Sequence, residues 1–472
     1  EIPNRGDSAP EIETSGKICN TSDDAVAGSL IVKFGEEAIP SLEQNALNAA
    51  QTRSALTRSG IESVDDILND LHVTSLERVF PEAGEHEART RAAGLHRWYV
   101  LGFASEEDLD KAAERLAGVA EISKVQFRTR LYRASDCKTY PFQATANGQT
   151  RALVTADFND PNLFWQWHYI NNADQAVATT SVAGADINVA DAWKLTAGNP
   201  EVIVAIVDEG VKYTHPDLAA NMWINKAEQS GATGRDDDGN GYADDVYGYN
   251  FALGTSRLTW DVEAYDDKGK NVGDSGHGTH VAGTVAAVSN NGVGVSGIAG
   301  GTGRNDGVKL MSCQIFSGGE GGSAAVSAEA IKYAADNGAS ILQCSWGYPT
   351  QSPFTSDSYY ERNYAAEKEA IDYFVSKKNN DVLDGGLAIF AAGNDATNFA
   401  SYPGGYRSYV SVTSFGPDYL PAYYTNYGPG CNVAAPGGDA YISPSGSSAA
   451  QVLSTLPSEL YQSDYGYMQG TS

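Results

Sequence analysis

The chain lacks any apolar run of the roughly 20 residues that a membrane-spanning helix requires. It is also poor in basic residues, because 32 lysines and arginines stand against 60 aspartates and glutamates, giving a net charge of −28. Such acidity disfavours binding to phosphate backbones and anionic lipid surfaces, so we expect neither nucleic acid nor a membrane as a partner. The acidity is typical of exported and calcium-binding proteins, and it also fits a surface that is merely solubilising.

Cysteine is scarce too, and the five cysteines are an odd number, so at least one has no intramolecular partner. Cys313 and Cys344 lie in hydrophobic, strand-like runs and are expected to be buried free thiols. Cys19 and Cys137 flank the first predicted domain and could form a disulfide. Cysteine usage therefore leaves the redox compartment open.

The first third of the chain divides into three parts. Residues 1–25 are polar and aperiodic, which predicts a disordered tail. Residues 26–135 give the order β-α-β-β-α-β, which predicts a small ferredoxin-like α+β domain, and Ser105 with Asp108 resembles a capping signal for its last helix. Residues 136–160 lack periodicity and are predicted to be a linker.

From residue 161 to 472, hydrophobic strands alternate with helices. This alternation predicts an α/β fold in which helices cover both faces of a parallel sheet. The expected strands are 202–207, 308–315, 340–345, 387–392, 409–414 and 432–435. The expected helices follow His277 or span 324–337 and 359–377. In such sheets functional residues gather at the carboxyl ends of the strands.

Four polar residues lie at ends of these predicted elements: Asp208, His277, Asn394 and Ser472. Each alone has an ordinary explanation, such as a capping histidine, a zinc-binding histidine paired with His280, or a turn asparagine. The order Asp, His, Ser is nevertheless that of one serine-protease arrangement. In it, Ser472 attacks the scissile carbonyl, His277 transfers the proton, Asp208 orients the imidazole and Asn394 stabilises the oxyanion.

The surrounding residues resemble the subtilisin-like serine proteases, the subtilases of peptidase family S8. The motifs that carry the resemblance are Asp208-Glu209-Gly210, Gly276–Gly283, Cys344–Gly347, Ala391–Asn394 and Gly470–Ser472. The resemblance implies a subtilisin-like catalytic domain over 161–472 and a serine endopeptidase acting on protein or peptide substrates. It also implies a substrate-binding edge, formed by Ser345, Trp346, Gly347, Ala392 and Gly393.

By the same resemblance, residues 26–135 are an inhibitor-like and chaperone-like prosegment, and the chain is a zymogen. A segment near 128–140 would then lie across the substrate subsites, with a processing site between Arg133 and Asp160. We expect a bacterial protein, secreted or at the cell surface, whose signal sequence has been removed. The family's serine motif continues into a buried helix beyond Ser472, so we expect the C-terminal part of the domain to be missing and the chain not to be competent by itself.

An acidic loop suggests a structural calcium ion. Its oxygen-bearing residues alternate as in the start of an EF-hand-type loop: Asp236, Asp238, Asn240, Tyr242 and Asp244. The glutamate expected at the twelfth position is replaced by Tyr247, so a solvated acidic turn is the alternative. The family resemblance implies a second calcium site, with Asp217, Asn290 and Asp160 as ligands.

Two other functions compete with the protease. One is a catalytically incompetent subtilase-like binding protein, and the other is a calcium-dependent structural protein. All four catalytic candidates are present, which argues against the first, and the motif order is unexplained by the second. For the protease, Trp346 and the glycine-rich residues 317–323 indicate an open apolar cleft and a preference for large hydrophobic residues before the scissile bond.

Overall fold

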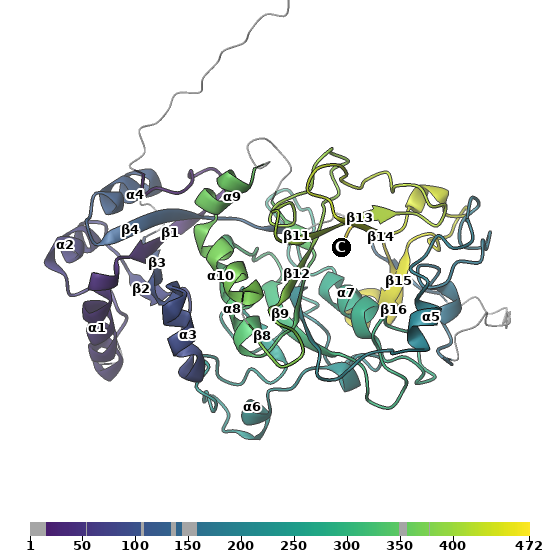
Figure 1. Ribbon diagram of the computed structural model, residues 1–472. Helices are drawn as coiled ribbons and strands as arrows, with labels where there is room; N and C mark the ends of the chain where they lie inside the picture. The colour runs from purple at the N-terminus through teal and green to yellow at the C-terminus, as the bar shows by residue number, and fades with distance from the viewer. Residues whose placement is uncertain are drawn as a thin grey trace, which may run out of the picture. The chain divides into compact units, whose positions relative to one another are not determined.

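The computed structural model describes residues 16–52, 54–104, 108–133, 138–143, 158–348, 356–376 and 378–472. They form two compact units (Figure 1). The first comprises the chain up to Pro81, Arg89–Arg130 and Arg362–Ala366. The second comprises Glu82–Ala88, Leu131–Glu361 and Glu367–Ser472. The predicted linker over 136–160 falls mostly outside the described residues.

The first unit is built on a four-stranded antiparallel sheet of order β2-β3-β1-β4 (Figure 1). Its strands are β1 (Ala25–Phe34), β2 (Ser75–Arg78), β3 (Trp98–Gly102) and β4 (Ile122–Thr129). Helices α1 (Ile39–Thr52), α2 (Glu62–Asp70) and α4 (Leu109–Ala117) join them, and the short α3 (Glu87–Ala92) precedes β3 in the sequence. Alternate apolar residues of β1, including Leu30, Val32 and Phe34, enter one core with the helices. The strand order is that of the expected ferredoxin-like domain.

Two local expectations for this unit are corrected. The predicted disordered tail over 1–25 is wrong for its described part, since Ile18 forms a bridge with Val125 and the backbone N–H of Cys19 donates to the carbonyl of Val125 at 2.8 Å. The apolar side chains of Ile18 and Cys19 give this stretch a reason to join the sheet. Helix α4 is capped by Asp108 itself, whose side chain accepts from the backbone N–H of Lys111, whereas Ser105 lies outside the described residues.

The second unit contains a seven-stranded sheet of order β14-β13-β12-β10-β7-β9-β8 (Figure 1). All six strand pairs are parallel. The strands are β7 (Ile203–Glu209), β8 (Gly248–Asn250), β9 (Lys309–Phe316), β10 (Ile341–Cys344), β12 (Leu387–Ala391), β13 (Val410–Phe415) and β14 (Val433–Pro436). The predicted parallel α/β sheet is therefore confirmed, and only the short β8 lacks a counterpart in the predicted strands.

The helices of this part of the chain are α5 (Val189–Trp193), α6 (Lys226–Ser230), α7 (His277–Ala286), α8 (Ala324–Asp336), α9 (Asp357–Asn363), α10 (Ala365–Val375) and α11 (Ser458–Tyr461). The single helix predicted over 359–377 is thus two helices, which meet at Tyr364. Helix α7 packs unusually closely on its neighbours, because a Cβ at Gly278 would lie 2.1 Å from the carbonyl oxygen of Glu209. Only glycine permits that approach.

Two small antiparallel sheets complete the second unit. One pairs β5 (Tyr132–Arg133) with β11 (Trp346–Gly347), and the other has the order β15 (Val452–Thr455), β16 (Tyr465–Met468), β6 (Tyr140–Pro141). Among the described residues, no helix combines the length and hydropathy needed to cross a membrane. Cys313 and Cys344 are buried free thiols, as predicted. Cys137 lies outside the described residues, so its pairing with Cys19 stays a prediction.

Candidate active site

Asp208 and His277 meet where β7 ends and α7 begins. Asp208 is the penultimate residue of β7, and the left-handed Gly276 (φ 74°) turns the chain into the helix that His277 opens. The Nδ1 atom of His277 lies 2.8 and 3.0 Å from the two carboxylate oxygens of Asp208, and both side chains are buried. The carboxylate accepts the Nδ1 proton, which leaves Nε2 as the basic atom of the neutral ring.

The next residue, Glu209, holds the start of α7 in place. Its Oε2 accepts hydrogen bonds from the backbone N–H groups of Ser275 at 2.9 Å and His277 at 3.0 Å, and its Oε1 accepts from the Ser275 hydroxyl at 3.0 Å. Burial raises the pKa of Glu209, although the nearby Arg133 opposes that shift. The helix N-terminus also favours a negative charge at this position. Two consecutive strand residues therefore position the imidazole and the backbone that carries it.

The electrostatics around His277 favour its protonated form. Burial alone would lower the pKa of His277, but the charge of Asp208 and its hydrogen bond outweigh burial, so the pKa is raised. This is the behaviour required of a base that must take up a proton. His280 differs, since burial lowers its pKa to about 4 and its Nε2 lies 3.1 Å from the Val452 carbonyl. A zinc site shared by the two histidines is not supported.

Asn394 and the serine segment form a second group. The side-chain oxygen of Asn394 accepts from the backbone N–H of Thr471 at 2.9 Å and from its hydroxyl at 3.0 Å. The Thr471 hydroxyl also accepts from the backbone N–H of Gly393 at 3.1 Å. This arrangement fixes the orientation of the Asn394 amide, whose nitrogen is the expected oxyanion donor.

Ser472 is placed beside this group but is not hydrogen-bonded to His277. Its Oγ is buried and has no hydrogen-bond partner among the described residues. It lines a cavity of about 170 Å³ with Gly470 and Thr471 and with residues of β12, β13 and β14. The structure thus brings Asp208 to His277, and Asn394 to the segment that ends with Ser472. Catalytic hydrogen bonds often shorten only when substrate is bound.

The predicted substrate-binding residues lie in or beside strand β11 and just after the end of β12. Gly347 and Trp346 form β11, which pairs with β5, and the buried indole of Trp346 packs edge-on against Phe390. Ser345 is buried and accepts a hydrogen bond from Gln343. Ala392 and Gly393 follow β12, and Gly393 has a left-handed φ of 106°. A pocket of about 150 Å³ lies between Gly347, Gly393 and Asn394.

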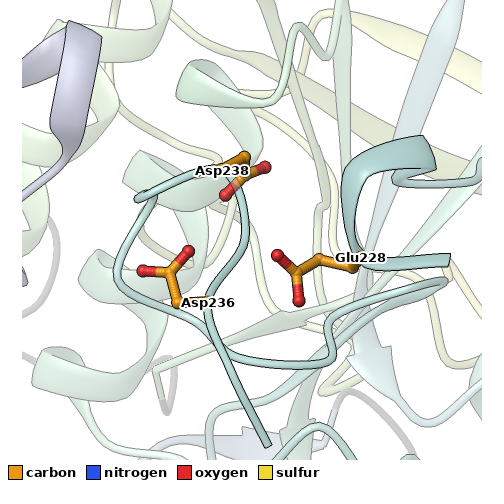
Figure 2. A group of neighbouring side chains, drawn as sticks. All are labelled: Glu228, Asp236 and Asp238. Carbon is orange, nitrogen blue, oxygen red and sulfur yellow. The ribbon is translucent and has the colours of Figure 1, made fainter. Parts of the chain in front are cut away.

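The acidic loop forms a compact group of carboxylates. Oxygens of Glu228, Asp236 and Asp238 lie within 4.8 Å of one another, the one such group of three potential metal ligands among the described residues. Figure 2 shows the side chain of Glu228, from α6, facing the two aspartates of the following loop. No lysine or arginine of the described chain forms an ion pair with them. Three close carboxylates without such a partner fit a hard cation such as calcium.

The other predicted ligands of this loop have different contacts. The Asn240 side chain donates to Asp245 at 3.0 Å and accepts from the Tyr242 backbone at 2.8 Å. The Tyr242 hydroxyl donates to Glu329, so only its backbone carbonyl is available to the loop interior. Asp244 accepts from the backbone N–H of Gly234 at 2.8 Å. The well-placed donors are therefore Asp236 and Asp238, which the alternating pattern identified, together with Glu228, which it could not reveal.

The second predicted calcium site is differently organised from the expectation. Asp217 is buried, accepts from the side chain of Asn291 at 2.8 Å and has its pKa raised to about 7 by burial. Asn290, the expected ligand, instead donates to the Thr302 carbonyl and accepts from the Asn159 backbone. Asp160 accepts from the backbone N–H groups of Asn290 and Asn291. The side chain beside Asp217 is therefore that of Asn291.

Most of the second unit is similar in sequence to known proteins. The model described as "Subtilase family" matches residues 199–472. Halolysin of Haloferax mediterranei is 32% identical over 294 residues, which cover 62% of this chain and 43% of halolysin. The halolysin-like extracellular serine protease Nep of Natrialba magadii is 31% identical over 280 residues, 57% of this chain and 41% of Nep.

Among solved structures, fervidolysin from Fervidobacterium pennivorans, a keratinolytic enzyme related to subtilisin, is similar in fold. Its TM-score is 0.57 at 19% identity, covering 98% of this chain and 56% of fervidolysin. At this identity the likeness concerns the fold alone. The chain spans less than two thirds of the length of each of these three relatives.

Proposed function

Because the chain belongs to the subtilase family, we propose that it is a serine endopeptidase that hydrolyses peptide bonds through Asp208, His277 and Ser472. The hydrogen bond between His277 Nδ1 and Asp208 carries the proposal. It orients Nε2 as the base for a serine hydroxyl and stabilises the imidazolium formed when the proton is taken up.

The steps of the reaction follow from these contacts. Ser472 Oγ attacks the scissile carbonyl while its proton passes to His277 Nε2, and His277 then gives that proton to the leaving amine. The negative oxygen of the tetrahedral intermediate receives a hydrogen bond from the Asn394 amide, whose side chain is held through Thr471. Removal of one such donor costs about 3 kcal/mol of transition-state stabilisation. Water then hydrolyses the acyl-enzyme with His277 again acting as base.

The two alternative functions predict a different outcome in a simple experiment. The natural full-length protein is treated with a fluorophosphonate probe, and the labelled peptide is identified by mass spectrometry. Labelling at Ser472, abolished in Ser472→Ala and strongly slowed in His277→Ala, is the expected result. A folded protein that stays unlabelled after proteolytic release of residues 26–135 would leave only the binding or structural functions.

We further propose that residues 26–135 are a prosegment that assists folding and inhibits the enzyme, so that the chain is a zymogen. Support comes from Tyr132 and Arg133, which form strand β5 against β11 within the second unit. A substrate bound in the extended form would use the same edge. Intact mass before and after activation tests this directly: cleavage between Arg133 and Asp160 is expected.

Calcium is proposed as a structural cofactor of the acidic loop, with Glu228, Asp236 and Asp238 as ligands. A second ion at Asp217, Asp160 and the loop of Asn290 and Asn291 stays a prediction from family resemblance. Secretion or surface exposure is also proposed, supported by the extracellular relative Nep. Substrates are proteins or peptides, and fractionation of the native organism would locate the protein.

A further inference from the structure

The side chain of Arg133 lies in an acidic pocket formed by Glu209 and Asp274. Strand β5 places Arg133 opposite Trp346 and Tyr132 opposite Gly347, and the backbone N–H of Leu131 donates to the Gly322 carbonyl at 2.9 Å. Residues 131–133 therefore extend along the edge of β11 as an added strand. An extended peptide bound in this way presents alternate side chains to opposite sides.

The guanidinium of Arg133 contacts carboxylates, backbone carbonyls and an aromatic ring. Its Nε lies 2.8 Å from Glu209 Oε1, and one terminal nitrogen lies 3.8 Å from Asp274 Oδ1. The terminal nitrogens donate to the carbonyls of Val272 and Gly318, each at 3.1 Å. The ring of Phe316 lies 5.3 Å from the guanidinium carbon. Planar, multidentate contacts of this kind match arginine better than any other side chain.

Both acids are rigid and shielded from solvent. The side chains of Glu209 and Asp274 are 0% exposed, against 24% for Arg133. The Asp274 carboxylate accepts from the backbone N–H groups of Val262 at 3.0 Å and Gly318 at 2.7 Å. Glu209 is held by Ser275 and the backbone of His277. Two buried carboxylate charges are costly without a cation, so a positive side chain stabilises the ionised form of this pocket.

The pocket has a defined position relative to the reacting bond. Arg133 also borders the separate 150 Å³ pocket that contains Asn394 and Gly393. The side chain after that of a bound arginine turns to the opposite side of the strand and reaches this second pocket. Since Asn394 is the proposed oxyanion donor, the carbonyl attacked belongs to that following residue. The acidic pocket therefore receives the residue two positions before the scissile bond.

We propose that Glu209 and Asp274 form a specificity pocket for a basic side chain, arginine above lysine, at the second position before the cleaved bond of substrates. The proposal rests on the proposed peptidase function. Arg133 occupies this pocket as an internal mimic of substrate. A pocket used only to hold Arg133 is the competing explanation, and it predicts no preference among substrates.

The test uses the natural full-length enzyme after activation, with active sites counted by fluorophosphonate labelling. Four fluorogenic peptides differ only at the second position before the scissile bond, which carries arginine, lysine, citrulline or leucine. Citrulline is the neutral isostere of arginine, so it isolates the charge. We expect kcat/KM for arginine to exceed that for citrulline by at least about 30-fold, as for other sites built around buried charge pairs.

Asp274→Asn is expected to lower the arginine-to-citrulline ratio at least about tenfold. Asp267→Asn, which removes an equal charge from an exposed residue, should leave the ratio unchanged. Equal cleavage of the arginine and citrulline peptides by labelled wild-type enzyme overturns the specificity proposal while the peptidase function stands. Absence of serine labelling rejects both. The comparison of the arginine and citrulline peptides with wild-type enzyme is decisive by itself. The proposal therefore stays testable even if the Asp274→Asn variant does not fold.

Discussion

Two acidic regions of the second unit differ in the source of their counter-charge. In the first, Glu209 and Asp274 are both paired with Arg133, a side chain of the same chain. In the second, Glu228, Asp236 and Asp238 have no ion-pair partner among the described lysines and arginines, and their carboxylate oxygens lie within 4.8 Å of one another, as ligands of a metal ion would. The first region should therefore discriminate among peptide side chains, and the second should respond to dissolved ions.

A third buried carboxylate, that of Glu367, differs from both: in the described part of the chain it has no ion-pair partner and belongs to no group of potential metal ligands. Glu367 accepts hydrogen bonds from the hydroxyls of Ser327 at 2.5 Å, Tyr360 at 2.8 Å and Tyr348 at 2.9 Å. Burial raises the pKa of Glu367 to about 7 despite these hydroxyls. Burial thus favours the protonated, neutral form of Glu367, whereas the charge of Glu209 is paired with Arg133.

The largest expected effect comes from a matched pair of substitutions. Glu209→Gln should lower kcat/KM for the arginine peptide by about 10²-fold or more, because it removes a buried charge that pairs with the substrate and positions His277. Glu228→Gln, measured at saturating calcium, should change kcat/KM per labelled active site by less than about threefold. Comparable losses in both variants would erase the functional distinction between the two regions.

The next effect concerns pH. The folded-state pKa of Glu367 lies above its ordinary value of 4.5, so the folded state holds the proton longer than the unfolded state. Stability from this residue is therefore full below pH about 4.5 and falls as the pH rises to about 7, by up to about 3 kcal/mol. Chemical denaturation of wild type and Glu367→Gln across this range measures it. The glutamine variant should lose this part of the pH slope, and parallel profiles would contradict the assignment.

Removal of calcium should lower the free energy of unfolding by a similar amount, which depends on the calcium concentration. At a calcium concentration 100 times the dissociation constant, binding to the folded state alone contributes about 2.7 kcal/mol. Chelation should therefore lower Tm by roughly 3–5 °C for a domain of this size. The double variant with Asp236→Asn and Asp238→Asn should have this lower Tm even without chelator, and its Tm should change little when chelator is added. An unchanged wild-type Tm in chelator would show that the three carboxylates hold no structural ion.

The smallest effect belongs to Arg133. Arg133→Met in the uncleaved chain leaves two buried carboxylates without their cation, which is destabilising. Because Arg133 is partly exposed, we expect a loss of about 1–2 kcal/mol in the free energy of unfolding. Addition of Asp274→Asn should recover part of the loss, and a double-mutant cycle measures the coupling. Strict additivity of the two changes would deny the interaction.

The sequence was most informative where local pattern and tertiary structure agree. Runs rich in apolar residues predicted β7, β9, β10, β12, β13 and β14 to within one or two residues, because strands of a parallel sheet covered by helices are mostly apolar. Asp208 and Asn394 were predicted beside such strands, and the structure places both there. The β8 strand is only three residues long, Gly248–Asn250, and carries too short a pattern to be recognised.

The sequence was least informative for side chains that act across long separations. Glu209 looked like part of a motif, yet its contacts come from Ser275 and Arg133, which are 66 and 76 positions away in the numbering. Glu228 precedes the alternating aspartates and falls outside their spacing, so only the fold brings it to Asp236. Asn290 and Asn291 are adjacent asparagines, and their backbone angles decide which of them faces Asp217.

The contact between Gly278 and the Glu209 carbonyl has a consequence for how this active site can diversify. Because a methyl group at residue 278 would lie 2.1 Å from that oxygen, the spacing between α7 and β7 is set by main-chain atoms. The separation of His277 from Asp208 is thus a property of the scaffold, whereas the charge offered to substrate depends on the side chains of Glu209 and Asp274. Substitution of those two acids should therefore change the preferred peptide while the distance between His277 and Asp208 stays the same.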